Sequence, residues 1–215
     1  MAELIYHPDP TSEEIAARLK QIPTCPGTCI FIDIINSTAL KYESPLWEWG
    51  VKLNNTFNFI SFLNDFPDHF VKGIGDELML YIPDDQLFNK QGYQNYLGLL
   101  QEIYSTIDNI KNFPVPGLFL QCKVVIHYCT SVYNITFFKG YNDYYGQDID
   151  LTARLMTKGK GNRIVMSEVF FQRVSRDIER NGEACQKECL DKISDKYIED
   201  FKGIPQAVAL RILDV

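Results

Sequence analysis

The hydrophobic positions of this chain change period repeatedly, between the spacing of a helix and the spacing of a strand. Apolar residues recur three and four positions apart over residues 46–65 and 93–110, which predicts two long amphipathic helices. Short apolar runs bounded by Gly, Pro, Asn or Asp predict strands at residues 28–35, 118–128, 132–138, 163–166 and 207–213. Because several strands follow one another as hairpins, we expect an α/β (α+β) sandwich with a mainly antiparallel sheet.

The ends of the chain and the segments between these runs are simpler to interpret. Residues 1–27 form an N-terminal helical segment, in which a Thr-Ser-Glu-Glu capping box at residues 11–14 begins a short helix. Residues 148–158 and 167–176 predict further helices. Trp47 and Trp49 are interpreted as packing residues of the first long helix.

Two acidic positions stand out against the apolar pattern. The stretch HFVKGIGDELMLYI, residues 69–82, predicts two strands joined by a glycine turn that Asp76 leaves. Asp33 interrupts an apolar strand, where an unpaired charge is costly, and Asn-Ser-Thr at residues 36–38 then begins a helix. Two aspartates at neighbouring strand ends, beside a helix N-terminus, predict a site for divalent metal and phosphate.

Composition limits the class of protein. At 215 residues and 46% apolar content the chain can bury one sizeable core. No apolar run approaches the roughly 20 residues that cross a bilayer, and the N-terminus lacks the pattern of a signal peptide, so we expect a cytoplasmic protein without a membrane partner. The net charge of −7 argues against a nucleic acid polymer as partner, but not against a nucleotide.

The cysteines do not predict a metal site. The six cysteines lack the two-residue gaps of zinc knuckles, and the chain has only three histidines. In a cytoplasmic setting we therefore expect reduced thiols that take no part in the chemistry.

A second candidate lies in YNDYYGQDIDLTAR, residues 141–154. A glycine turn leads into a helix on which Asp150 and Arg154, four positions apart, share one face. Arg154 either forms a surface ion pair with Asp150 or stabilises charge on a transferring phosphoryl group. Spacing alone favours the ion pair.

Four motifs occur in the order FIDIINST, KGIGDELM, DYYGQDIDLTAR and FKGIP. They resemble F-x-D-I-x-x-x-T, K-x-I-G-D-x-x-M, D-x-W-G-x-x-V-N-x-A-x-R and the late V-K-G turn of the class III nucleotidyl cyclase (adenylate/guanylate cyclase) catalytic domain. The resemblance covers about residues 28–213. It implies the class III cyclase fold, with a ferredoxin-like βαββαβ core, over residues 28–215.

The resemblance implies a metal and phosphate site. Asp33 and Asp76 would bind two Mg²⁺ or Mn²⁺ ions, with the backbone carbonyl of Ile34 as a further ligand. The phosphates of a nucleoside triphosphate would lie on backbone amides around three residues: Asn36, Ser37 and Thr38.

The resemblance also implies the remaining roles. Arg154 would stabilise the α-phosphoryl transition state, Lys202 would reach the terminal phosphates, and Lys72 with Asp143 would read the base. Asp150 stands where the family usually has an asparagine that orients the ribose. An acid can still accept a ribose hydrogen bond, so we expect Asp150→Asn to be tolerated.

The family's sites are shared between two catalytic domains. A stand-alone chain therefore implies a head-to-tail homodimer. One subunit would give Asp33 and Asp76, and the other Asp143, Asp150 and Arg154.

The residues that would read the base match two kinds of cyclase. Lys72 and Asp143 match the adenine-reading pair of adenylate cyclases. However, D-I-x-x-S-T-A-L-K-Y and G-x-D-I-D-L-T-A-R-L look more like the bacterial pyrimidine (uridylate/cytidylate) cyclases of Pycsar-type antiphage defence, which make cyclic UMP or cyclic CMP. Tyr42 is either a core aromatic or a residue that leaves room only for a one-ring base. UTP is favoured, with CTP and ATP as alternatives.

Two other classes remain as alternatives. A degenerate, non-catalytic nucleotide-binding module is one, although both metal acids, Arg154 and Lys202 are present. A diguanylate cyclase is the other, since GIGDE is similar to that family's G-G-D-E-F hairpin, but DYYGQDIDLTAR has no place in that family.

Overall fold

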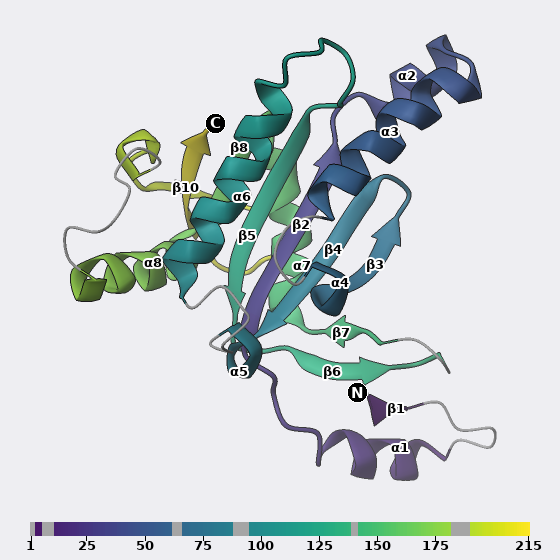
Figure 1. The fold of residues 1–215 in the computed structure, drawn as a ribbon. Coiled ribbons are helices and arrows are strands. Elements are labelled where there is room, and N and C mark those ends of the chain that lie inside the picture. The colour runs from purple at the N-terminus through teal and green to yellow at the C-terminus, as the bar shows by residue number, and fades with distance from the viewer. Residues whose placement is uncertain (1–2, 6–10, 62–65, 88–94, 139–141, 182–189) are drawn as a thin grey trace.

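A seven-stranded sheet forms the centre of the structure, a computed structural model that describes residues 3–5, 11–61, 66–87, 95–138, 142–181 and 190–215. The strands lie in the order β3-β4-β2-β5-β8-β10-β9 (Figure 1). Their bounds, in that order, are Phe70–Ile74, Glu77–Pro83, Gly27–Ile34, Cys122–Cys129, Arg163–Ser167, Val208–Asp214 and Tyr197–Glu199. Neighbouring strands are antiparallel except β5 and β8, which are parallel.

Four of these strands and two helices make the predicted βαββαβ core. In chain order they are β2, α3 (Leu46–Ile60), β3, β4, α6 (Tyr96–Lys111) and β5. The four strands pair in the order β3-β4-β2-β5, the ferredoxin-like arrangement. The predicted fold class is confirmed.

Helices cover both faces of the sheet. In Figure 1, α3 and α6 cross the front of the sheet, whereas α7 (Gln147–Leu155) lies behind it. Along β2, Ile30 and Ile32 pack in the core on the α6 side, and Cys29 and Phe31 pack in the core on the α7 side. Burial on both faces explains why this strand is an almost continuous apolar run.

The N-terminal segment contains more than a helix. Thr11 caps α1 (Ser12–Leu19) by accepting the backbone N–H of Glu14 at 3.3 Å, as the capping box predicts. β1 (Glu3–Leu4) pairs with β6 (Tyr133–Thr136), which in turn pairs with β7 (Tyr144–Tyr145). This second, three-stranded sheet joins the front segment to the main domain.

Several predicted boundaries differ. The strands expected at residues 118–128 and 132–138 are β5 and β6, and they lie in different sheets. The first long helix ends at Ile60, and residues 62–65 lie outside the described part of the chain. The remaining helices among the described residues are α2 (Ser37–Glu43), α4 (Phe66–His69), α5 (Asp84–Leu87), α8 (Glu168–Asn181) and two 3-10 helices (Met156–Lys158 and Leu190–Lys192).

The predicted apolar face of α3 is only partly buried. Leu53, Phe57 and Ile60 pack against the core, as the spacing predicts. Trp47 is 73% exposed, so its interpretation as a packing residue is wrong within this chain. Among the described residues, none of the helices combines the length and apolar content needed to cross a bilayer.

Candidate active site

Asp33 lies near the end of β2, between two charged neighbours on the adjacent strands. In register it faces Lys123 on β5 and Glu77 on β4. Lys123 Nζ lies 2.7 Å from Asp33 Oδ2. The lysine neutralises the acid, which explains how a charge is accommodated in an otherwise buried strand.

Asp76 lies in the tight turn between β3 and β4, where Gly75 has a φ of 68°. The Ser37 hydroxyl donates a hydrogen bond to Asp76 Oδ2, and Lys41 Nζ lies 3.3 Å from Oδ1. Burial alone would raise the pKa of Asp76, but the contacts with Ser37 and Lys41 outweigh it and lower that pKa. Asp76 is therefore ionised at neutral pH and connects the hairpin to the start of α2.

Glu77 connects the two aspartates electrostatically. Its pKa is raised, first by burial and then by the negative charges of Asp33 and Asp76, while Lys123 opposes the shift. Three carboxyl groups thus gather beside two lysines. The side chains of Asp33 and Asp76 are each 20% exposed, so an ion can reach them. Partly exposed carboxylate oxygens are the donors that Mg²⁺ and Mn²⁺ prefer, so this donor set fits the predicted metals.

The loop between β2 and α2 has a distinctive backbone. Ile34 is the last residue of β2. Asn36 takes a left-handed conformation, with φ 58°, and its side chain makes no capping hydrogen bond. Ser37 is buried against Asp76, whereas Thr38 is exposed. The left-handed residue turns the chain so that α2 begins next to the acids.

Lys72 and Asp143, both predicted to read the base, lie in contact. Lys72 Nζ is 2.8 Å from Asp143 Oδ1 and 2.9 Å from Oδ2. The backbone N–H of Tyr144 donates to Asp143 Oδ1 at 2.8 Å, and the Lys72 ammonium lies 5.5 Å from the centre of the Tyr145 ring. The two residues predicted to read the base are therefore in direct contact.

Asp150 and Arg154 are exposed on α7, and the described residues include no ion pair between them. Arg154 instead lies against the turn after Lys202, since a Cβ at Gly203 would be 3.3 Å from Arg154 Nη2. Asp150, Arg154 and Gly203 line a pocket of about 590 Å³. The surface ion pair favoured by the spacing is thus wrong.

The predicted site residues form separate groups in one chain. Across the described ranges, no hydrogen bond or ion pair joins Asp33 or Asp76 to Arg154 or Lys202. The sequence reasoning missed Lys41 and Lys123. Lys41 follows Ser37 by four positions on the same helix, a spacing that could have revealed it. Lys123 reaches Asp33 through the register of β2 and β5, and nothing in the sequence near Lys123 indicates that contact.

Solved structures of two kinds of cyclase share this architecture. The adenylyl cyclase CyaB from P. aeruginosa superposes with a TM-score of 0.64 at 18% identity, covering 90% of this chain and 95% of that one. The guanylyl cyclase Cya2 gives a TM-score of 0.67 at 16% identity, covering 89% of this chain and 93% of that one. The chain has the fold of adenylyl and guanylyl cyclase catalytic domains. The guanylate cyclase domain of RhGC from Catenaria anguillulae, in complex with GTP, matches this cyclase fold with a TM-score of 0.64 at 14% identity, covering 88% of this chain and 96% of that one.

The other two comparisons find nothing. No protein-family model matches the sequence, and a comparison with curated proteins finds no match. The solved cyclases, at 14–18% identity, therefore show the fold of this chain.

Tyr42 takes an unexpected place in this cyclase fold. It lies on α2 and is 90% exposed, so the alternative of a core aromatic is wrong. Its ring is free of the core and stands on the helix that begins beside Asp76.

Proposed function

We propose that the chain is a nucleotidyl cyclase, which converts a nucleoside triphosphate to a 3′,5′-cyclic nucleotide and pyrophosphate. The observation that carries the proposal is the charge arrangement. Asp33, near the end of β2, and Asp76, in the turn between β3 and β4, each hold a lysine ammonium, whereas the ion pairs of the described residues include neither Arg154 nor Lys202. One group is suited to bind cations and the other to bind phosphate. The cyclase fold supports this assignment.

The metal-binding residues in this proposal are Asp33, Asp76 and the backbone carbonyl of Ile34. They would hold Mg²⁺ or Mn²⁺, two per site, in place of the ammonium groups of Lys123 and Lys41. When bound, the ions would supply neutralisation of triphosphate charge and activation of the attacking ribose oxygen.

The remaining steps belong to side chains and amides. The ribose 3′-hydroxyl loses its proton to solvent as its oxygen bonds to the α-phosphorus, the bond from the α-phosphorus to the bridging oxygen breaks, and pyrophosphate leaves. Arg154 would stabilise the charge that develops on the α-phosphoryl group, and Lys202 would hold the terminal phosphates. Asp150 would accept a hydrogen bond from the ribose. The phosphates would lie on amides around three residues of the loop: Asn36, Ser37 and Thr38.

The separation of the two groups supports a site shared between two copies of the chain. The exposed apolar side chains of α2 and α3 include Tyr42, Leu46, Trp47 and Val51. The neighbouring edge strand β3 adds exposed Ile74. Such a surface suits a second copy, and a head-to-tail homodimer would bring Asp33 and Asp76 of one subunit to Asp143, Asp150 and Arg154 of the other.

Mixing two inactive variants tests both the activity and the shared site. Asp33→Asn and Arg154→Ala should each abolish turnover of the best substrate in the presence of Mn²⁺. In a mixture, half of the dimers are mixed and each has one intact site, so about a quarter of wild-type activity should return. Full activity of either variant alone would refute the catalytic roles. Inactive variants that fail to complement would refute the shared site.

The preferred base is proposed to be uracil, with cyclic UMP as a second messenger in antiphage defence. The resemblance to pyrimidine cyclases and the exposed ring of Tyr42 support a pyrimidine, with CTP as the close alternative. The Lys72–Asp143 pair favours a second candidate, an adenylate cyclase. Incubation with ATP, GTP, CTP and UTP in turn, with mass analysis of products, separates them. If uracil is preferred, Tyr42→Ala should raise the use of ATP relative to UTP.

A further inference from the structure

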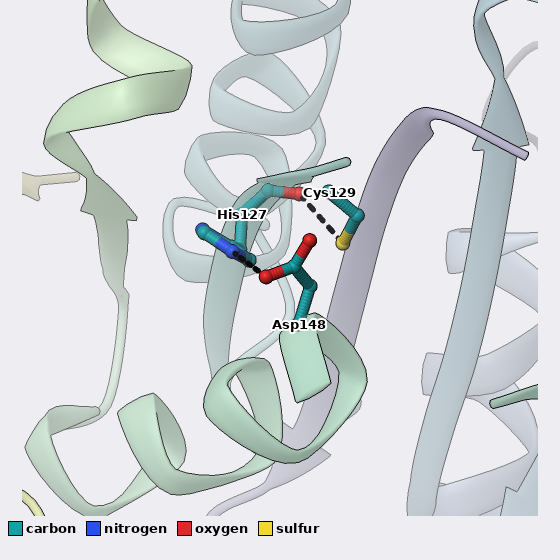
Figure 2. Close-up of side chains that lie close together, drawn as sticks. All are labelled: His127, Cys129 and Asp148. Carbon is teal, nitrogen blue, oxygen red and sulfur yellow. Dashed lines mark hydrogen bonds and ion pairs between the residues drawn. The ribbon is translucent and has the colours of Figure 1, made fainter. Parts of the chain in front are cut away.

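Three potential metal ligands lie together on the α7 face of the sheet. His127 and Cys129 lie two positions apart on β5, so both side chains point to the same face, and Asp148 lies in the first turn of α7. Figure 2 shows the Asp148 carboxylate between the imidazole and the thiol. The ligand atoms all lie within 4.8 Å of one another, and no other such group of three occurs in the described ranges.

His127 is buried without its usual partners. Its side chain is 5% exposed, yet neither ring nitrogen has a hydrogen-bond partner among the residues that the structure describes. Nε2 lies 3.7 Å from Asp148 Oδ1, which is longer than a hydrogen bond. Buried nitrogens of this kind are normally satisfied, so a ligand for Nε2 would remove an unfavourable feature.

Asp148 is held in place by two backbone amides. Its Oδ2 accepts the backbone N–H groups of Thr130 at 2.6 Å and Ser131 at 2.8 Å, which leaves Oδ1 facing His127. Two backbone amides thus fix the carboxylate with one oxygen directed toward the imidazole.

The spacing suits a tetrahedral ion. Zinc bonds of about 2.0–2.3 Å place neighbouring ligand atoms roughly 3.3–3.8 Å apart. The 3.7 Å between Nε2 and Oδ1 falls in this range, and the remaining separations, all within 4.8 Å, need only a small inward movement of the thiol.

We propose that His127 Nε2, Cys129 Sγ and Asp148 Oδ1 bind a transition metal, best matched by Zn²⁺. Thiolate and imidazole favour zinc, whereas the all-oxygen group at Asp33 and Asp76 favours Mg²⁺ or Mn²⁺. As the Zn–S bond forms, the thiol proton passes to solvent. Because the thiol must lose its proton to bind the metal, binding should tighten as pH rises.

The pocket next to α7 gives the ion an entry path and a fourth position. His127 and Asp148 both line this cavity of about 590 Å³, which has room for a water molecule. An ion there would tie the first turn of α7 to β5 without using any residue of the proposed cyclase site. The proposal therefore stands independently of the cyclase assignment.

Cobalt titration of the reduced, metal-free chain tests the site. An Asp33→Asn/Asp76→Asn background removes the oxygen site from the measurement. We expect one Co²⁺ per chain with thiolate-to-cobalt charge-transfer absorption, displacement by Zn²⁺, and release of one proton on binding. Cys129→Ser should remove the charge-transfer band. His127→Gln and Asp148→Asn should weaken binding at least about tenfold, since even outer-shell substitutions cost about 10- to 100-fold.

The matched control is Cys122→Ser, which changes a buried thiol on the same strand β5 in the core on the α6 side and should keep the band. A band that survives Cys129→Ser, or the absence of any thiolate band, overturns the proposal. Should Asp148→Asn fail to fold, as circular dichroism would reveal, Cys129→Ser and His127→Gln still decide the matter.

Discussion

Lys72 and Asp143, 71 positions apart in the sequence, meet in an ion pair in which the ammonium contacts both carboxylate oxygens, at 2.8 and 2.9 Å. The Asp143 side chain is 14% exposed and is held by the N–H of Tyr144, whereas that of Lys72 is 37% exposed. The lysine is thus the member that can reorient. For a base that binds here, Asp143 would be a fixed hydrogen-bond acceptor and Lys72 a donor that can adjust its position. Together they would recognise a base edge that carries one donor and one acceptor.

Removing the lysine should impair recognition of the base. We expect Lys72→Met to lower kcat/KM for the preferred nucleotide by about 10- to 100-fold, since a hydrogen bond to a charged group contributes about 1.5–3 kcal/mol. The loss should be smaller for nucleotides that are poor substrates. Lys52→Met, which removes a lysine paired with Glu48 at 3.2 Å on α3, is the control. An unchanged preference among the four nucleotides in Lys72→Met would contradict this role.

Lys123 should compete with the metal for Asp33. In the metal-free protein Lys123→Met leaves Asp33 without its partner at 2.7 Å, and we expect a loss of about 1 kcal/mol in unfolding free energy for this partly buried pair. Added Mn²⁺ should then bind more tightly than in the wild type and raise the Tm by more. Calorimetric titration with Mn²⁺ alone measures both effects. Weaker Mn²⁺ binding in Lys123→Met would show that the lysine does not occupy the metal's position.

Asp150→Asn should be tolerated. Asp150 is exposed and has no ion pair with Arg154, so the change removes no contact found among the described residues and takes away a negative charge beside the proposed phosphate site. We expect kcat to stay within about threefold of the wild type and KM for the nucleotide to fall, because uncompensated negative charge opposes a triphosphate. Steady-state kinetics at fixed Mn²⁺ decide the point. Loss of turnover would mean that the acid itself takes part in the reaction.

Local periodicity predicted the helices and strands in which the spacing of apolar residues is itself regular. β2 was expected at residues 28–35 and spans Gly27–Ile34, because both of its faces are buried and its run of apolar residues is continuous. β1 was missed, since a strand of only Glu3–Leu4 has no period of its own and forms by pairing with β6. The partners of Asp33 and Asp76 were missed for a related reason. Lys123 reaches Asp33 through strand register, which short-range pattern does not encode.

The cysteine pattern shows the same limit. The prediction looked for pairs of cysteines separated by two residues, as in zinc knuckles, and the sequence has none. His127 and Cys129 share a face through strand alternation, but Asp148 joins them from the next helix. Such a group becomes visible only when α7 is packed against β5.

Gly203 and Gly117 form a matched pair for testing the turn under Arg154. Both have positive φ, 82° and 74°, so alanine should cost each about 1–2 kcal/mol of unfolding free energy. A Cβ at Gly203 would lie 3.3 Å from Arg154 Nη2, whereas one at Gly117 meets nothing within 4 Å. We therefore expect Gly203→Ala to lower kcat further than Gly117→Ala, by at least about tenfold, if Arg154 acts in the transition state. Equal kcat values in the two variants would remove Arg154 from that role.

Asp84, directly after β4, accepts hydrogen bonds from two tyrosine hydroxyls. Tyr96 donates to Oδ1 at 2.8 Å and Tyr128 to Oδ2 at 2.6 Å, while the Arg173 guanidinium stacks on the Tyr128 ring. Tyr128→Phe leaves Oδ2 without this donor. We expect it to lower the unfolding free energy by about 1–3 kcal/mol at pH 7, measured by urea denaturation. Tyr133→Phe, an exposed tyrosine on β6, is the control and should change it by less than about 0.5 kcal/mol.

The contribution of Tyr128 should also depend on pH in the alkaline range. Burial, followed by the hydrogen bond to Asp84, raises the pKa of Tyr128 from 10.0 to about 12. Because the folded-state pKa is the higher one, the stabilisation is complete below pH 10 and is lost as pH rises through about 12. The difference between wild type and Tyr128→Phe should therefore be constant from about pH 7 to 9 and shrink above pH 10. If the stability difference instead grew with pH, the contact between Tyr128 and Asp84 would have to strengthen when the tyrosine ionises. That contradicts this account, because the phenolate and the carboxylate repel each other.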